Sequence, residues 1–210
     1  MGRQHLCALA TVVASAAIAA CQGDRTVSAP LGPGSAPAVR ANAWQNTKGL
    51  NDTLVTTFKV QPNRALSQTL AGGHKIYFSK GAICDPATSG YGVDTWETAC
   101  QRATRSVTIT ARSWLDSAGH PFVEFSPALR FNPDDERPVW LVLVDKKTAR
   151  EEGITIGYCT ENDNPASCVD ESLTDSELVT FRDPKKGYLY RRIKHFSGYN
   201  ITAGYSSSIE

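Results

Sequence analysis

The sequence lacks the signatures of the common enzyme classes. It contains no P-loop, no dinucleotide-binding glycine fingerprint, no nucleophile elbow and no His-Glu-x-x-His zinc motif. Histidine is scarce, with 4 residues in 210, and the formal net charge is only +1. These absences argue against a conventional hydrolase or oxidoreductase and against a nucleic-acid partner. We therefore expect no conventional enzyme, no cofactor and no metal site.

Long helical periodicity is also missing beyond the N-terminal segment. Short alternating runs separated by turn signals are found instead, and the clearest is Ser106–Ala111, with Val107 and Ile109 on one face. The unbroken apolar run Val139–Val144 predicts a central strand buried on both faces. A series of such short strands indicates a sandwich or barrel, and we predict an all-β fold, an antiparallel β-sandwich. The expected strands lie at 54–60, 74–78, 106–111, 122–125, 129–131, 139–144, 154–159, 178–182, 188–196 and 199–203.

The N-terminus has the pattern of an export signal. Arg3 precedes the apolar run Leu6–Ala20, which is too short to span a bilayer stably. The run ends in Ile18-Ala-Ala-Cys21, which resembles a bacterial lipobox with cleavage before the cysteine and lipid attached to Cys21. An ordinary secretory signal is the alternative. Gln22, where an Asp would resemble an inner-membrane retention signal, favours the outer membrane.

Three segments follow from this pattern. Residues 1–20 are the predicted signal peptide, and residues 21–50 are the lipidated N-terminus with a linker rich in Ala, Pro, Gly and Ser. Such a composition cannot bury a core and is typical of a flexible tether. Residues 51–210 are the predicted β-sandwich domain. We expect an exported protein held in the cell envelope by lipid at Cys21, with an envelope protein or a glycan as its partner.

Cysteine usage is consistent with an oxidising compartment. Once Cys7 leaves with the signal and Cys21 carries lipid, an even number remains: Cys84, Cys100, Cys159 and Cys168. Of the three possible pairings we predict Cys84–Cys100 and Cys159–Cys168, because each pair brackets one polar loop containing Gly, Asn or Pro. A zinc site is the alternative, but the ligand spacing of such sites is missing.

Basic residues gather near the C-terminal end of the chain. Lys185, Lys186, Arg191, Arg192 and Lys194 form a local cluster. We interpret it as a solvated turn and strand face in preference to a phosphate or lipid head-group patch.

The tripeptide His195-Phe196-Ser197 is the best candidate for covalent chemistry. Odd-numbered residues such as Ile193 and Tyr199 are apolar, so the odd face of this predicted strand should be the core face. His195 and Ser197 share that parity and should point the same way, with the Phe196 carbonyl between them. A hydroxyl beside a histidine and a peptide carbonyl is the combination needed for nucleophilic attack.

Several stretches within residues 54–204 resemble, in order, the ZU-five domain of netrin receptors, ankyrins and the death-domain protein PIDD. The matching stretches are Gly81–Ile83, Val107–Thr110, Phe125–Phe131 with Pro138, and His195–Tyr199. The resemblance implies a β-sandwich. Some members of that family cut themselves between Phe and Ser of a His-Phe-Ser motif, which implies cleavage between Phe196 and Ser197.

Three stretches have no counterpart in the animal domains: Gly90–Gly92, Trp96–Cys100 and Val169–Leu173. They resemble a bacterial envelope subgroup, so the signalling role of the animal proteins does not carry over. Two hypotheses remain. The chain is a structural or binding module of the envelope, or the same scaffold cleaves itself once with Ser197 as nucleophile and His195 as base.

Overall fold

The computed structural model describes residues 53–134, 136–161 and 164–203, and they form an all-β sandwich. The six-stranded sheet has the order β1-β4-β5-β11-β7-β8 and the five-stranded sheet has the order β2-β3-β6-β10-β9. Every strand pairing in both sheets is antiparallel. The predicted fold class is confirmed. The predicted signal peptide, Cys21 and the linker lie outside the described residues.

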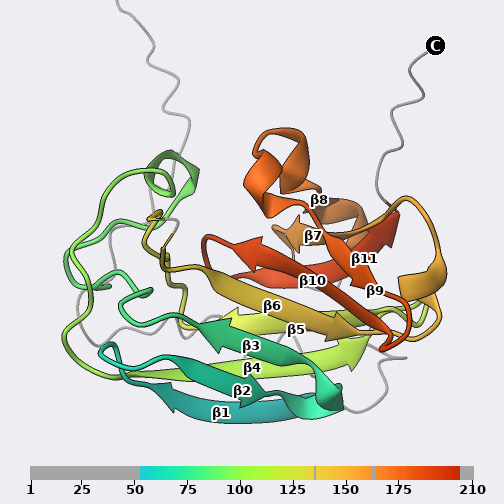
Figure 1. The fold of residues 1–210 in the computed structure, drawn as a ribbon, viewed down its shortest axis with the longest axis horizontal. Coiled ribbons are helices and arrows are strands. Elements are labelled where there is room, and N and C mark those ends of the chain that lie inside the picture. The colour runs from blue at the N-terminus through green and yellow to red at the C-terminus, as the bar shows by residue number, and fades with distance from the viewer. Residues whose placement is uncertain (1–52, 135, 162–163, 204–210) are drawn as a thin grey trace, which may run out of the picture.

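The strands are short, as the alternating pattern predicts. In the six-stranded sheet they are β1 (Leu54–Val60), β4 (Val107–Leu115), β5 (Pro121–Ser126), β7 (Ile154–Cys159), β8 (Cys168–Val169) and β11 (Gly198–Ala203). In the five-stranded sheet they are β2 (Leu66–Thr69), β3 (Lys75–Phe78), β6 (Val139–Val144), β9 (Phe181–Asp183) and β10 (Tyr188–Ile193). Figure 1 shows the sheets packed as layers, with β1 and β2 at the lower end and β7 and β8 at the upper end.

The helical elements of the described residues are single 3-10 turns. They are η1 (Ala71–Gly73), η2 (Val93–Thr95), η3 (Thr148–Arg150), η4 (Pro165–Ser167), η5 (Glu171–Leu173) and η6 (Ser176–Leu178). Within the described part of the chain, no helix has the length and apolar character needed to cross a bilayer.

The core lies between the two sheets and is rich in aromatic rings. Phe78, Phe125 and Phe131 all contact Phe196, with ring centroids 4.4–6.0 Å apart. Leu141 and Leu143 of β6 are fully buried in the same cluster. Burial of this apolar surface contributes roughly 25 cal/mol per Å² to stability.

Several strand predictions need correction. Residues 129–131 form isolated bridges instead of a strand. Phe131 pairs with Ile83, and Arg130 pairs with His195. Leu178 lies in η6, and the strand there is Phe181–Asp183. The prediction missed β2 and β8. In β6 the face with Trp140 and Val144 is only half-buried, so burial is complete on one face alone.

Both predicted disulfides are present. Cys84 pairs with Cys100, and Cys159 pairs with Cys168, with Cα–Cα distances of 5.6 and 3.8 Å. The first closes the loop between β3 and β4, and the second ties β7 to β8, where these two cysteines are register partners. Each bond therefore fixes the base of a polar loop.

Candidate functional site

The predicted basic cluster is largely buried, which corrects the interpretation of a solvated face. Arg191, Arg192 and Lys194 expose only 0%, 7% and 6% of their surface, whereas Lys185 and Lys186 are exposed. A buried cation is costly unless a carboxylate and hydrogen bonds compensate it. The compensating groups come from loops that the sequence did not connect with this strand.

Carboxylates of η5 and η6 pair with each of these cations. The Arg191 guanidinium donates to Glu171 Oε2 at 2.7 Å and to the Ile156 carbonyl of β7 at 2.6 Å. Arg192 pairs with Glu177 at 2.7 Å. The strand end is thus fixed by charge-assisted hydrogen bonds, which are stronger than neutral ones.

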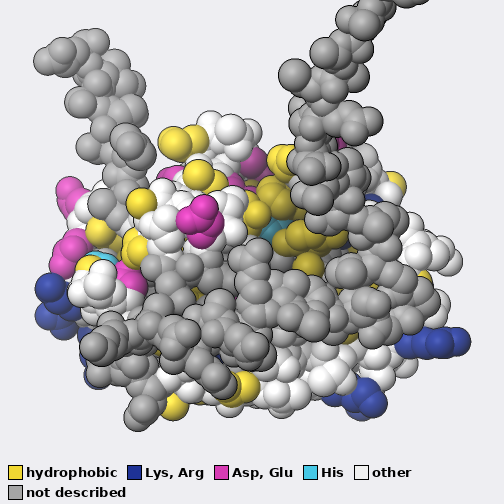
Figure 2. Space-filling model, turned by 180° about the vertical axis from the view of Figure 1, so that it is seen from behind, with side chains coloured by type: hydrophobic (Ala, Val, Ile, Leu, Met, Phe, Trp, Pro, Cys, Tyr) yellow, Lys and Arg dark blue, Asp and Glu magenta, His cyan; other side chains and the backbone are white. Residues whose placement is uncertain are grey.

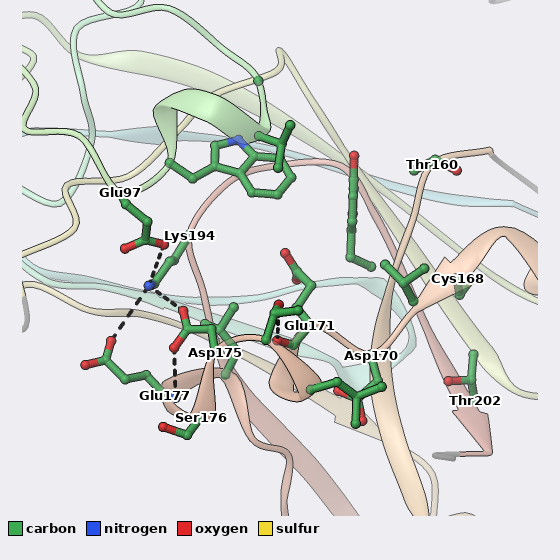
Figure 3. Close-up of a pocket in the computed structure, with 18 of the residues that line it drawn as sticks. Glu97, Thr160, Cys168, Asp170, Glu171, Asp175, Ser176, Glu177, Lys194 and Thr202 are labelled. Carbon is green, nitrogen blue, oxygen red and sulfur yellow. Dashed lines mark hydrogen bonds and ion pairs between the residues drawn. The ribbon is translucent and has the colours of Figure 1, made fainter. Parts of the chain in front are cut away.

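Lys194 lies among three carboxylates. Its Nζ is 2.7 Å from Glu97 and 3.8 Å from Glu177, and it also contacts Asp175 (Figure 3). Burial works to lower the pKa of Lys194, but the hydrogen bonds and charges of Asp175 and Glu97 outweigh it, so the pKa is raised. The ammonium therefore joins the loop of the first disulfide to η6.

His195 is fully buried between a carboxylate and aromatic rings. Its Nε2 is 3.0 Å from Glu171 Oε1, and its ring stacks on Trp96 with centroids 3.6 Å apart. The Tyr158 ring meets it edge-on at 4.6 Å. Among the described residues, no group bonds to its Nδ1. A carboxylate only accepts hydrogen bonds, so in the neutral ring Glu171 favours the tautomer with the proton on Nε2 and the lone pair on Nδ1.

Phe196 places its side chain and its carbonyl in different environments. The ring is fully buried in the core, stacked on Phe125 at 4.4 Å. Its N–H donates to the Leu129 carbonyl at 2.7 Å, and its carbonyl accepts from the Tyr91 hydroxyl. Burial first, then the charges of Tyr158 and Glu171, raise the pKa of Tyr91, so the phenol stays protonated.

The Ser197 hydroxyl forms a hydrogen bond with a backbone carbonyl and not with His195. The hydroxyl donates to the Cys159 carbonyl at 3.1 Å. Burial raises the pKa of Tyr158 above its ordinary value, and the hydrogen bond with Ser197 offsets part of this increase. In the described part of the chain, no hydrogen bond joins Ser197 to His195.

The predicted parity of this segment is wrong in one respect. His195 and Ser197 both contact Tyr158 and so share a side, but Phe196 is the residue that enters the core. The alternation breaks because β10 ends at Ile193 and β11 begins at Gly198. The residues between them bend instead of continuing one strand.

A groove of about 1620 Å³ is lined in part by Trp96, Tyr158 and Glu171, the side chains that contact His195. Tyr91, Val93 and Trp96 of the first disulfide loop line one part, and Val169 and Leu173 line another. Val93, Val169 and Leu173 expose 70%, 51% and 66% of their surface. Figure 2 shows hydrophobic and acidic side chains interspersed near the top of the molecule, with basic side chains at the sides and below. Glu97, Asp170, Asp175 and Glu177 also line the groove, so it offers apolar contacts with an acidic rim.

The other two histidines of the described residues, His74 and His120, lie away from this site. His74 Nδ1 accepts from the Val144 N–H at 3.0 Å, and burial, opposed by Asp145, lowers its pKa to about 4. His120 lies 3.6 Å from Asp145 and 3.3 Å from Thr148. Within the described residues, no three His, Cys, Asp or Glu side chains gather as a metal site would require.

Sequence reasoning missed Tyr91, Trp96 and Glu171, the residues that surround His195 and Phe196. A signal for them existed, since Gly90–Gly92, Trp96–Cys100 and Val169–Leu173 are the stretches without a counterpart in the ZU-five domains. Scans against protein-family models, curated proteins and solved structures give no match to this chain.

Proposed function

We propose that this chain is an exported, lipid-anchored module that binds a partner protein of the envelope through the groove. The observation that carries the binding function is the gathering of exposed Val93, Val169 and Leu173 around one groove. Exposed apolar patches of this kind mark interaction sites. The aliphatic side chains of Val93, Val169 and Leu173 offer no hydrogen bonds to the hydroxyl groups of a glycan, so they favour an apolar protein segment.

Site-specific photo-crosslinking tests the groove. A photoreactive amino acid at Leu173 should give protein adducts in intact envelopes, and the same group at Val55 of β1, exposed by 59%, is the matched control. Adducts at Leu173 that Val93→Asp suppresses support the proposal. Equal labelling from both positions, labelling of glycan alone, or no adduct overturns it.

The lipid anchor rests on Arg3, the apolar run Leu6–Ala20 and the Ile18-Ala-Ala-Cys21 pattern. Cys21→Ser should move the protein from the membrane fraction to the soluble envelope fraction, because the acyl chains supply the membrane affinity. Sedimentation of the variant with membranes would contradict the lipobox assignment.

A second function is self-cleavage between Phe196 and Ser197. The observation that favours it is the Glu171–His195 contact at 3.0 Å, which leaves Nδ1 with a free lone pair in a fully buried ring. A carboxylate that fixes the histidine tautomer is the arrangement used by general bases in acyl transfer.

The reaction is an N-to-O acyl shift. The Ser197 hydroxyl, which donates to Cys159 in the structure, first rotates toward the Phe196 carbonyl. Its Oγ forms a bond to the carbonyl carbon while His195 takes the hydroxyl proton, and the carbonyl oxygen takes the electron pair. The C–N bond then breaks, and the Ser197 nitrogen takes that proton. Water hydrolyses the ester, giving a carboxylate at Phe196 and restoring the Ser197 hydroxyl.

Intact-mass measurement under denaturing conditions tests the cleavage. Under native conditions the fragment starting at Ser197 stays bound, because β11 pairs with both β5 and β7. Two masses that sum to the mature chain plus one water, lost in Ser197→Ala, support self-cleavage. A single full-length mass in both proteins overturns it.

A further inference from the structure

The loop closed by the Cys84–Cys100 disulfide makes successive contacts along residues 194–196. Glu97 pairs with Lys194 at 2.7 Å, Trp96 stacks on His195, and the Tyr91 hydroxyl donates to the Phe196 carbonyl. The peptide proposed to break is therefore contacted by a loop about a hundred residues earlier in the chain.

This loop is held rigidly against the sandwich. The buried Arg130 donates to the carbonyls of Thr95, Thr98 and Ala99, the latter two at 2.8 and 3.4 Å. The disulfide fixes its base at Cys84 and Cys100. A donor on such a loop is pre-positioned and needs no reorganisation when charge develops near it.

Tyr91 is the one donor to the Phe196 carbonyl among the hydrogen bonds of the described residues. This carbonyl has left the β10 ladder and precedes β11, so no backbone N–H from either strand reaches it. When Oγ attacks the carbonyl carbon, negative charge collects on this oxygen. A phenol that already donates to it forms a stronger bond to the oxyanion than to the carbonyl.

We propose that Tyr91 is a catalytic residue of the self-cleavage, supplying the hydrogen bond that stabilises the oxyanion on Phe196. This inference rests on the self-cleavage function proposed above. In the first step its hydroxyl stays bonded to the oxygen that receives the carbonyl electron pair, and it neither loses nor gains a proton. After the C–N bond breaks, the same hydroxyl donates its hydrogen bond to the carbonyl oxygen of the ester.

The test is a time course of the mature chain made by cell-free synthesis and analysed by denaturing intact mass. Four proteins are compared: the natural sequence, Tyr91→Phe, Tyr77→Phe and Ser197→Ala. Tyr77 lies on β3 and is 37% exposed, so Tyr77→Phe removes a phenol hydroxyl without touching the site. Near-ultraviolet circular dichroism verifies that Tyr91→Phe keeps the folded state.

We expect Tyr91→Phe to slow cleavage by about 100-fold, the usual loss for one oxyanion donor, and Tyr77→Phe to cleave at the natural rate. If the natural chain cleaves and folded Tyr91→Phe keeps pace with it, the role of Tyr91 is wrong and self-cleavage stands. If the natural chain gives no fragment, self-cleavage itself fails and the role of Tyr91 fails with it.

Discussion

Strands β6 and β10 lie side by side in one sheet, yet two paired residues in them are buried by different means. Leu141 of β6 is the register partner of Arg191 of β10, and both side chains are 0% exposed. Leu141 packs into the apolar core, where removal from water alone stabilises it. Arg191 reaches Ile156 of the opposite sheet and Glu171 of η5. Burial of Leu141 is thus supported by packing, and burial of Arg191 depends on polar partners supplied by η5 and β7.

This difference determines which substitutions should destabilise the fold most. An apolar side chain that is shortened leaves a cavity, and the cost scales with the missing atoms. A buried cation that loses its carboxylate is left uncompensated, and the cost exceeds what the intact pair contributed.

The largest expected effect is therefore at Glu171. Glu171→Ala leaves Arg191 and His195 without their carboxylate, and should lower the free energy of unfolding by about 3–5 kcal/mol. The double variant Glu171→Gln, Arg191→Met removes both charges and should recover most of this loss. Urea unfolding measures both, with the exposed Glu152→Ala as control, which should stay within about 0.5 kcal/mol. A double variant as unstable as Glu171→Ala would contradict the view that the loss comes from an uncompensated Arg191.

A smaller effect is expected on the other strand. Leu141→Ala should cost about 3 kcal/mol through lost burial and a residual cavity. The loss should be independent of pH, because no charge is uncovered. Urea unfolding at pH 5 and pH 8 checks this, and a loss that differs strongly between them would contradict purely apolar burial.

The end of β6 adds a pH dependence of its own. Since burial lowers the pKa of His74 from 6.5 to about 4, the unfolded chain takes up the proton first as pH falls. The contribution of His74 to the free energy of unfolding is fully present above pH 6.5. It should fall by about 1.4 kcal/mol per pH unit until about pH 4. His74→Gln, whose amide oxygen is able to accept from Val144, should flatten this part of the curve. An unchanged slope would rule out His74 as its source.

The smallest effect concerns Asp175, next to β10. Burial raises its pKa, but Lys194, the Glu177 N–H and Arg192 outweigh burial, so the pKa lies below the ordinary 3.8. A lowered carboxyl pKa stabilises the fold above the unfolded value, and this stability is lost as pH falls through the folded value. Asp175→Asn should therefore reduce the loss below pH 3.8 and leave the His74 region unchanged. Acid unfolding curves of Asp175→Asn and His74→Gln separate the contributions of these two residues to the loss of stability at low pH.

Local pattern predicted the longer apolar strands correctly. The alternation in Val107–Ala111 and the apolar run Val139–Val144 predict strands that the structure contains, because a period of two is a property of neighbouring residues. The edge strand β2 (Leu66–Thr69) was missed because its exposed Ser and Thr give no apolar alternation. The parity prediction failed at Phe196 for a related reason, since the bend between β10 and β11 interrupts the period of two.

The sequence by itself determined the all-β class and the two disulfides, whose partners are separated by 16 and 9 residues and bracket recognisable loops. Only the tertiary structure decided that Arg191 is buried, that Glu171 holds His195 and that Tyr91 meets the Phe196 carbonyl. Tyr91 and Phe196 are 105 residues apart, and Glu171 is 24 residues before His195. Alternation between neighbouring residues does not predict such contacts, because they arise when the packed sheets bring separate loops to the same end of the sandwich.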